Sequence, residues 1–313
     1  MDIEILLLLQ KLRELTGGIF NDLFAFVTNI AVDYYIIIPV LIIMWAIDKK
    51  KGIFAYASHG IACFLNAMLK STFCVYRPWI RDSRIEPLQS AISGATGYSF
   101  PSGHSTSTSS VYLAIRNKFK KYKTISVFCI VMTGITMFSR IFVGVHTPQD
   151  VVVGLLIGIV SVVIANSVSK YIDKNNDKDW VVLLVTIIIT VVGLLYVALK
   201  DYPVDYVDGK VLVDPISMTI NSFKDPGTFF GVVVAWFIER RYVNYSIEGT
   251  TYEKITRCII GIALMIAYYT IVINGISKLI NINIVYFLTR ASLPILCICV
   301  YPLTWSNRKK KTK

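Results

Sequence analysis

The sequence predicts an all-α integral membrane protein, a polytopic bundle of about nine transmembrane helices. Two observations support this prediction. Of the 313 residues, 55% are hydrophobic and only 17% are charged, with a mean hydropathy of +0.60, whereas a soluble domain of this size has a more charged surface. Apolar runs such as VVLLVTIIITVVGLLYVAL (181–199) recur along the chain, and about 20 such residues are enough to cross the hydrocarbon core.

The charged residues are few, but their balance is strongly basic. The net charge of +12 comes from 32 lysines and arginines against 20 acidic residues. In a soluble chain this excess would suggest nucleic acid, but here the basic residues cluster between apolar segments, as in cytoplasmic loops. We therefore expect membrane topology, and not nucleic-acid binding, to explain the charge.

The first 28 residues are expected to lie outside the bundle. Residues 3–16 mix leucines with charged residues, which favours an amphipathic helix lying at the membrane interface. The beginning, MDIEILLLLQKLREL, has acidic residues where a signal peptide needs basic ones, and it has no small-residue cleavage site. We interpret residues 1–28 as an N-terminal interfacial amphipathic segment.

The segments that follow predict the spans of the bundle. The third and seventh spans are short or polar for contact with lipid, so we expect them inside the bundle. The polar stretch DKNNDKD (173–179) separates a first bundle, residues 29–172, from additional C-terminal transmembrane helices in residues 173–313. The expected spans are 29–47, 52–73, 102–119, 124–143, 148–170, 180–199, 226–240, 256–279 and 283–304.

Basic connections alternate with acidic or neutral ones along this plan. The basic connections are DKKK (48–51), RNKFKKYK (116–123), ERR (239–241) and RKKKTK (308–313). The positive-inside rule places them in the cytoplasm, which gives a cytoplasmic C-terminus and, with nine spans, an outside N-terminus. The composition is rich in Ile, Lys and Asn, which hints at an AT-rich bacterial genome and hence at a bacterial cytoplasmic membrane.

Three polar motifs fall at span ends on the opposite, extracytoplasmic face. KSTFCVYRP (70–78) ends the second span, PSGH (101–104) opens the third, and SRIFVGVHTPQD (139–150) joins the fourth to the fifth. Ionisable residues within spans are costly and usually functional. The orientation is derived from the basic connections alone, without regard to these motifs. Because all three motifs nevertheless fall on the same face, we infer that they form a common site.

The residues of these motifs suit phosphoryl transfer. Lys70, Arg77 and Arg140 can donate hydrogen bonds to phosphate oxygens, and the planar guanidinium suits bidentate contact. The third and fifth spans both begin at the site, and helix N-termini attract anions. Ser102 is placed as an N-cap, and Gly103 lets the backbone approach a phosphate closely.

Two histidines remain for the bond-making and bond-breaking steps. His146 lies four residues before Asp150, whose carboxylate can accept the proton of one ring nitrogen and leave the other free to attack phosphorus. His104, at a helix start, can protonate the leaving oxygen and later activate water. The intermediate of such a reaction is a phosphohistidine.

Taken together, Lys-x6-Arg-Pro, Pro-Ser-Gly-His and Ser-Arg-x5-His-x3-Asp resemble the signature of the type 2 phosphatidic acid phosphatase superfamily, over residues of about 70–150. The resemblance implies a phosphatidic acid phosphatase-type helical core without a metal requirement. It implies that the catalytic residues are His104 as general acid and His146 as nucleophile paired with Asp150. The phosphate ligands that it implies are Lys70, Arg77, Ser102, Gly103 and Arg140.

Some of these residues also have purely structural interpretations when taken singly. Asp150 could be only a helix cap, and Lys70 could extend to the interface as lysines near span ends do. We interpret His59, within the second span, as a polar packing contact. Arg81 and Arg84 could contact a second anionic group or a lipid headgroup, or they could belong to a solvated loop.

Neither a cofactor nor a metal is expected. The cysteines show no pairing pattern and fall mostly in apolar segments, where cysteine behaves as a small hydrophobe, so they indicate neither a disulfide framework nor a metal site. The six are Cys63, Cys74, Cys129, Cys258, Cys297 and Cys299.

The function that we predict is a membrane phosphatase that hydrolyses a lipid phosphate or diphosphate at the extracytoplasmic face. Phosphatidate, phosphatidylglycerophosphate and polyprenyl diphosphate all fit, with the apolar tail in the bilayer. The alternatives are a sugar-phosphate phosphatase similar to glucose-6-phosphatase, a phosphotransferase that uses an acceptor other than water, and a non-enzymatic membrane scaffold or transporter. The sequence leaves the oligomeric state open.

Overall fold

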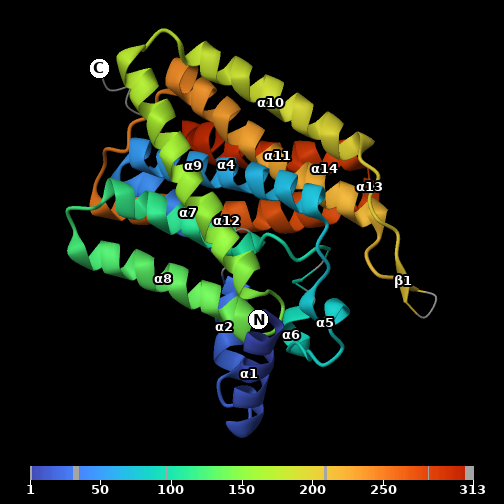
Figure 1. Ribbon diagram of the computed structural model, residues 1–313. Coiled ribbons are helices and arrows are strands. Elements are labelled where there is room, and N and C mark those ends of the chain that lie inside the picture. Colours follow the sequence, from blue (N-terminus) through green and yellow to red (C-terminus); the bar gives the residue numbers. More distant parts are fainter. Residues whose placement is uncertain are drawn as a thin grey trace, which may run out of the picture.

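The computed structural model describes residues 2–30, 35–92, 94–95, 97–207, 210–280 and 282–306. These residues form a bundle of long helices, which confirms the predicted all-α class (Figure 1). Within the described residues the strands are limited to β1 (Tyr206–Val207) and β2 (Lys210–Val211), which pair antiparallel. The basic tail at 308–313 and part of the first predicted span, residues 31–34, lie outside the described residues.

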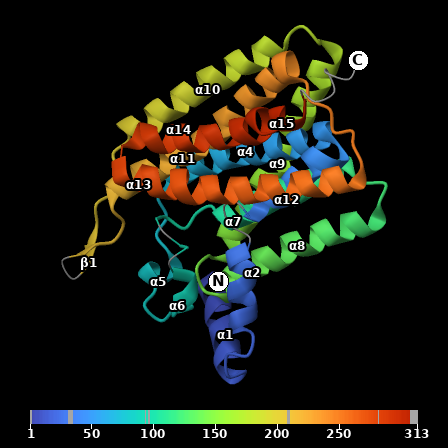
Figure 2. The ribbon, with the colours of Figure 1, turned by 180° about the vertical axis from the view of Figure 1, so that it is seen from behind.

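The N-terminal helices meet the end of the bundle. Helix α1 (Asp2–Leu15) runs across the direction of α8 and projects from the bundle, and α2 (Asn21–Ile30) returns to it (Figure 1, Figure 2). Leu8, Leu12 and Leu15 of α1 are exposed. An exposed apolar face on a helix that lies across the bundle is the arrangement expected of an interfacial helix.

The first half of the bundle consists of four long helices. They are α4 (Lys49–Phe73), α7 (Gly103–Lys118), α8 (Lys123–Phe142) and α9 (Pro148–Lys174), and α7 packs against the other three. Two glycines let α9 approach α7 closely. A Cβ added to Gly158 would lie 2.0 Å from Ser109 Oγ, and one added to Gly154 would lie 2.8 Å from Ser105 Cβ. Small residues at helix interfaces permit such close packing within membranes.

The hydroxyl side chains of α7 bond to the same neighbours. Asn66 Nδ2 of α4 donates to Thr106 Oγ1 at 2.9 Å, and Ser109 Oγ donates to the Gly154 carbonyl of α9 at 3.3 Å. Ser58 Oγ of α4 donates to the Ser110 carbonyl at 3.2 Å. The polar start of α7 therefore faces the interior of the bundle and not lipid.

The second half of the bundle packs around α11 (Pro215–Ile238), which contacts α4, α10 (Asp179–Leu199) and α14 (Asn283–Ile295). Helix α12 (Thr251–Tyr268) continues as the π-helix η4 (Tyr269–Ile276). Lys49 Nζ of α4 pairs with Glu239 Oε1 at 2.6 Å and so ties the two halves together. The shorter elements are η1 (Tyr35–Ile37), α3 (Ile38–Ile42), η2 (Ile43–Ile47), α5 (Pro78–Arg81), α6 (Gln89–Ile92), η3 (Glu239–Val243), α13 (Ser277–Ile280), η5 (Leu296–Val300) and α15 (Leu303–Ser306).

The number of membrane spans differs from the nine that were expected. Within the described residues, six helical segments are long and apolar enough to cross a membrane, and a seventh results if α2 and residues 35–47, bent by 68°, count as one span. The six are Lys49–Arg81, Lys123–Phe142, Pro148–Lys174, Asp179–Leu199, Thr251–Gly275 and Asn283–Ser306. The two remaining predicted spans correspond to α7 and α11, whose many buried residues agree with the expected interior position. The count of nine is thus not confirmed.

Candidate active site

The three sequence motifs meet at one end of the first four-helix group. The C-terminal parts of α4 and α8 contribute Lys70 and Arg140, and the N-terminal turns of α7 and α9 contribute His104 and Asp150. The backbone N–H of Ser102 donates to the Asp150 carbonyl at 3.0 Å, which joins the beginnings of α7 and α9. Lys70 and Asp150, which are 80 positions apart in the sequence, therefore share one site.

Asp150 both caps α9 and holds His146. Its Oδ2 accepts hydrogen bonds from the Thr147 N–H at 2.9 Å and from Ser99 Oγ at 2.5 Å, and it lies 3.2 Å from His146 Nδ1. In return, Thr147 Oγ1 accepts from the Asp150 N–H at 3.3 Å, which completes a capping box. Asp150 therefore caps α9 and also contacts the imidazole of His146, and its part in catalysis stays a prediction.

Arg77 contacts the opposite nitrogen of the same imidazole. Its side chain is 4% exposed, and Nη1 lies 2.9 Å from His146 Nε2 and 3.1 Å from the Val145 carbonyl. A guanidinium has no acceptor, so Nε2 must carry a lone pair and Nδ1 must carry the proton that points to Asp150. This is the tautomer that a nucleophilic Nε2 requires.

The cations around His146 also favour its neutral form. His146 lies in the connection between α8 and α9 and is buried. Burial and the positive charges of Arg77, Arg140 and Lys70 hold the pKa of His146 well below its ordinary value. The imidazole is thus unprotonated on Nε2 at neutral pH.

Arg140 is a fully buried cation. Its side chain is 0% exposed, and Nε, Nη1 and Nη2 have no hydrogen-bond partner within the described part of the chain. A buried polar group without a partner is costly, and a charged one is more so. Because three donors of one guanidinium face no protein acceptor, Arg140 suits the oxygens of an anionic ligand.

Lys70 binds the loop that precedes α7. Its Nζ donates to the carbonyls of Tyr98 and Pro101, both at 3.0 Å, and lies 3.5 Å from the carbonyl of Ser99. These bonds hold the chain that carries Ser99 toward Asp150. Lys70 therefore fixes the loop of the site through these bonds, and its binding of phosphate stays a prediction.

The start of α7 carries the remaining motif residues. Ser102 is the N-cap, and its Oγ accepts from the Ser105 N–H at 3.4 Å. The nearest atom to a Cβ added at Gly103 would be Asn66 Oδ1, at 3.8 Å, so protein packing alone does not require a glycine there. His104 is partly exposed on the first turn and interacts electrostatically with His146 and Arg140.

Arg81 and Arg84 lie in and after α5, at the surface. Arg84 is 60% exposed and pairs with Asp82 at 2.7 Å and with Glu4 of α1 at 3.5 Å. Arg81 is exposed as well. Their arrangement fits a solvated loop that contacts α1, and their contact with a headgroup stays a prediction.

Ser99 was missed in the sequence. Its side chain is buried and donates to Asp150, and its Oγ also lies 3.4 Å from His146 Nδ1. The only signal was its position two residues before Pro101, just ahead of the PSGH motif. Serine is common in turns, so this position alone did not distinguish a hydrogen bond to the carboxylate from ordinary turn chemistry.

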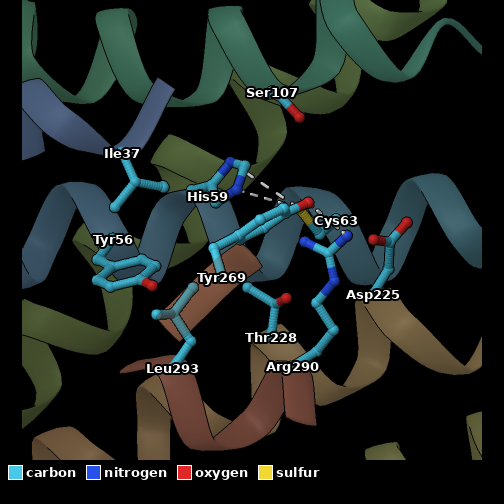
Figure 3. A pocket seen from close by; sticks show the side chains of 10 residues that line it. All are labelled: Ile37, Tyr56, His59, Cys63, Ser107, Asp225, Thr228, Tyr269, Arg290 and Leu293. Atoms are coloured by element: carbon cyan, nitrogen blue, oxygen red, sulfur yellow. Dashed lines mark hydrogen bonds between the residues drawn. The ribbon is translucent and has the colours of Figure 1, made fainter. Parts of the chain in front are cut away.

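A second polar region lies further inside the bundle. A cavity of about 80 Å³ is bordered by His59 and Cys63 of α4, Ser107 of α7, Asp225 of α11 and Arg290 of α14, which point toward one another in Figure 3. His59 lies 3.4 Å from Cys63 Sγ through Nε2 and 3.5 Å from Ser110 Oγ through Nδ1. His59 therefore makes the polar packing contacts that were predicted, at a place where the two halves of the bundle meet.

Two family models match the chain. The PAP2 superfamily model matches residues 52–174 and contains all the motifs described above, and the model of the PAP2 superfamily phosphatase transmembrane extension matches residues 223–312. No solved structure matches. The first matched region thus covers α4 to α9, and the second covers most of the helices that pack around α11.

Individual relatives match over shorter lengths. The chain is 30% identical to an undecaprenyl-diphosphatase of Sulfolobus acidocaldarius over 141 residues, 44% of this chain and 65% of the relative. It is 27% identical to undecaprenyl-diphosphatase BcrC of Bacillus subtilis over 146 residues, 46% of this chain and 72% of the relative. A lipid A 1-phosphatase of Rhizobium etli is 40% identical over 60 residues, 19% of this chain and 25% of the relative.

Proposed function

The chain belongs to the PAP2 superfamily, and on that premise we propose that it is an integral membrane phosphatase that hydrolyses a lipid phosphate or diphosphate. The reaction would proceed through a phosphohistidine at the extracytoplasmic face. The observation that carries this proposal is the buried guanidinium of Arg140, whose three nitrogens have no acceptor among the described residues, beside a neutral His146.

The first step would form a bond between His146 Nε2 and phosphorus. The guanidinium of Arg77 would transfer its Nη1 contact from Nε2 to a phosphate oxygen, and Arg140 would bind the other oxygens. As Nε2 gives its lone pair to phosphorus, the imidazole becomes positively charged, and Asp150 stabilises this charge through Nδ1–H. The phosphorus–oxygen bond to the substrate breaks, and His104 donates its proton to the leaving oxygen.

The second step would hydrolyse the phosphohistidine. His104, now neutral, takes a proton from water, and the hydroxide oxygen bonds to phosphorus as the nitrogen–phosphorus bond breaks. His146 Nε2 regains its lone pair, and inorganic phosphate leaves. We assign phosphate binding to Lys70, Arg77, Ser102, Gly103 and Arg140, of which Lys70 acts mainly by holding the loop of residues 98–101.

A lipid substrate is favoured over a sugar phosphate. The relatives are named for undecaprenyl diphosphate and for the 1-phosphate of lipid A. We propose a substrate whose phosphate enters the site while its tail stays in the bilayer, as with phosphatidate, phosphatidylglycerophosphate or a polyprenyl diphosphate. Exposed apolar side chains along the spans, such as Ile130 of α8 and Leu156 of α9, suit contact with the acyl region of such a membrane.

The orientation proposed from the sequence agrees with where the basic connections lie. The site uses the C-terminal end of α4 and the N-terminal end of α7, so the connections at 48–51 and 116–123 belong to the other end of these helices. The positive-inside rule then puts the site outside, in a bacterial cytoplasmic membrane. The division into residues 1–28, 29–172 and 173–313 also remains our proposal.

The proposal is tested by trapping the intermediate. Purified protein in detergent would be mixed with a ³²P-labelled lipid phosphate in the presence of a chelator, quenched in alkali and analysed for alkali-stable phosphoprotein. We expect label on the wild type, none on His146→Ala, and turnover that the chelator does not reduce. Phosphate release by a folded His146→Ala protein at the wild-type rate would overturn the proposed mechanism and favour another nucleophile, whereas no release by the wild type from any lipid phosphate would favour a non-enzymatic role.

A further inference from the structure

A polar cavity lies between the N-terminal helices and the loop between α5 and α6. It measures about 370 Å³, which is within the range of small-molecule sites. Helices α1 and α6 lie side by side in both views (Figure 1, Figure 2). The polar side chains that border it are those of Gln10, Arg13, Glu14, Asn21, Glu86 and Gln89.

The cavity adjoins the catalytic loop. Its wall includes Pro87 and Leu88, and the Leu88 N–H donates to the Val143 carbonyl at 3.0 Å. A Cβ added to Gly144 would lie 3.1 Å from Pro87 Cα, so the two loops are in direct contact. Since Gly144 is two residues before His146, the lining of the cavity lies against the loop that carries the nucleophile.

Two buried polar atoms of the cavity lining lack partners. Arg13 is 7% exposed and donates through Nη2 to the Glu86 carbonyl at 2.7 Å, but its Nε has no hydrogen-bond partner among the described residues. The Oδ1 of Asn21 is likewise buried without a donor among them. Both atoms are costly to leave unsatisfied, and a ligand toward which the two side chains turn would satisfy one donor and one acceptor.

The charges of the cavity indicate which ligand it fits. Arg13 has the carboxylates of Glu14 and Glu86 as electrostatic neighbours, so two negative charges outweigh one positive charge. This net negative charge disfavours binding of another phosphate group in the cavity, in addition to the one at the catalytic site. A neutral hydroxyl both donates and accepts, which matches the free Nε–H of Arg13 and the free Oδ1 of Asn21.

We propose that this cavity is a subsite for a hydroxyl-rich headgroup, a saccharide that the lipid carries next to the phosphate that is hydrolysed. The inference rests on the proposed function and adds that, among lipid phosphates, those that bear a saccharide are preferred to phosphatidate. α1, which meets the end of the bundle with its apolar face exposed, and the start of α2 would bring Arg13 and Asn21, respectively, to the level where such a headgroup leaves the bilayer.

The test compares two substrates in the same detergent, an acylated disaccharide 1-phosphate and phosphatidate. For Asn21→Ala we expect the ratio of kcat/KM for the saccharide substrate to that for phosphatidate to fall about tenfold, as loss of one hydrogen bond predicts. Lys11→Ala, on the exposed side of α1, is the matched control and should leave the ratio unchanged. An Asn21→Ala ratio equal to that of the wild type would overturn the subsite, whether both activities fall together or neither falls.

A binding measurement separates this inference from the proposed function. Saturation-transfer NMR would use the deacylated disaccharide 1-phosphate and His146→Ala protein, which cannot turn it over. We expect saturation of the sugar protons, which Arg13→Lys and Asn21→Ala weaken. Absence of sugar saturation would overturn the subsite even if lipid phosphatase activity is present. Saturation without any lipid phosphatase activity in the wild type would support the subsite and contradict the proposed function.

Discussion

The Nη1 atom of Arg77 lies 2.9 Å from Nε2 of His146, the nitrogen that we propose to attack phosphorus. A cation in this position keeps the imidazole neutral, because it repels a proton on Nε2. The same guanidinium can bond to a phosphate oxygen when the substrate arrives. In the proposed mechanism Arg77 would thus link substrate binding to release of the nucleophile's lone pair, and this relationship leads to the first prediction.

Arg77→Lys should lower kcat/KM by about 100-fold or more, because an ammonium cannot contact the phosphate with two donors of a planar fork. The measurement is steady-state phosphate release in detergent. Arg257→Lys is a matched control, because Arg257 also donates to backbone carbonyls, of Ile247 and Glu248, on an element that the proposed mechanism does not use. Activity of Arg77→Lys within threefold of the control would contradict the role given to Arg77.

Asp150→Asn separates the two roles of this carboxylate. The amide oxygen can still accept from the Thr147 N–H, so the cap survives, but the negative charge that stabilises the imidazolium is lost. We expect a fall in kcat of at least about 100-fold, with a melting temperature close to that of the wild type. Thr147→Val removes the reciprocal bond of the capping box and should instead cost about 1 kcal/mol of stability. If Asp150→Asn keeps the wild-type kcat, the negative charge does not act on His146, and the cap that the amide preserves is the dominant role of this residue.

Ser99→Ala tests a residue that acts through Asp150. Ser99 Oγ donates to Asp150 Oδ2 at 2.5 Å, so its loss frees the carboxylate to rotate away from His146. We expect kcat to fall about tenfold while KM stays within twofold, and Ser99→Thr, which keeps the hydroxyl, to recover part of the rate. A change in KM alone would show that Ser99 affects substrate binding and not the orientation of the nucleophile.

The pH dependence follows from the direction of the pKa of His146. Burial and the neighbouring cations hold this pKa well below the ordinary histidine value of 6.5. Protonated imidazole cannot attack, so His146 should not slow phosphohistidine formation as the pH falls through 6.5, and any decrease should appear only further into the acid range. His104 must carry a proton to act as the acid, so its titration can only raise the rate over the same fall in pH. Rapid-quench measurements of labelled intermediate at a series of pH values check this. A decrease in this rate centred at or above pH 6.5 would show that the pKa of His146 is not lowered.

The same shift has a consequence for stability. Histidine in the unfolded chain gains a proton below pH of about 6.5, whereas His146 in the folded protein does not until the pH is lower. The folded protein is therefore relatively destabilised as the pH falls below the ordinary value, since protonation favours the unfolded chain. The measurement is thermal unfolding of the wild type and His146→Gln between pH 7.5 and 5.5, a window that brackets about 6.5. The melting temperature of the wild type should fall more steeply with decreasing pH than that of His146→Gln.

Much of the site could be predicted from the sequence, because its motifs lie where apolar segments end. His104, His146 and Asp150 stand out as polar residues at the ends of membrane-type helices, and phosphoryl transfer needs such groups. The contact of Ser99 with Asp150 could not be predicted, since 51 residues separate them and the loop that joins them depends on Lys70. Nor could Arg13 be placed against Glu86, because an amphipathic pattern shows which face is apolar but not what the polar face meets.

The count of spans shows the same limit at the level of the fold. Apolar runs predicted the positions of the helices, including α7 and α11. Whether a helix crosses the lipid or lies inside the bundle depends on its neighbours, and six helical segments meet the criterion for a span by length and composition within the described residues. A polar helix such as α7 is stable there because α4, α8 and α9 surround it and satisfy its hydroxyls.

Packing of α7 against α9 yields the last prediction. A Cβ on Gly158 would lie 2.0 Å from Ser109 Oγ, 2.7 Å from Ser109 Cβ and 2.9 Å from the Ser110 N. The hydroxyl could rotate away, but the Cβ and backbone atoms could not, so Gly158→Ala must push the two helices apart. Overpacking of this kind costs about 1–3 kcal/mol, and it would also shift His104 relative to His146, because α7 and α9 carry or adjoin them. We therefore expect a lower melting temperature together with a lower kcat.

Gly134 of α8 is the matched control for this substitution. A Cβ added there would meet nothing within 4 Å, so Gly134→Ala has the helix-propensity gain of alanine, up to about 1 kcal/mol, without a clash. Differential scanning fluorimetry in detergent should place Gly134→Ala at or above the wild type and Gly158→Ala below it. A double variant, Gly158→Ala with Ser109→Gly, removes the Ser109 side chain and should recover part of the lost stability. If Gly158→Ala alone has the same melting temperature as the wild type, then α7 and α9 are not in the close contact on which the alignment of the two histidines depends.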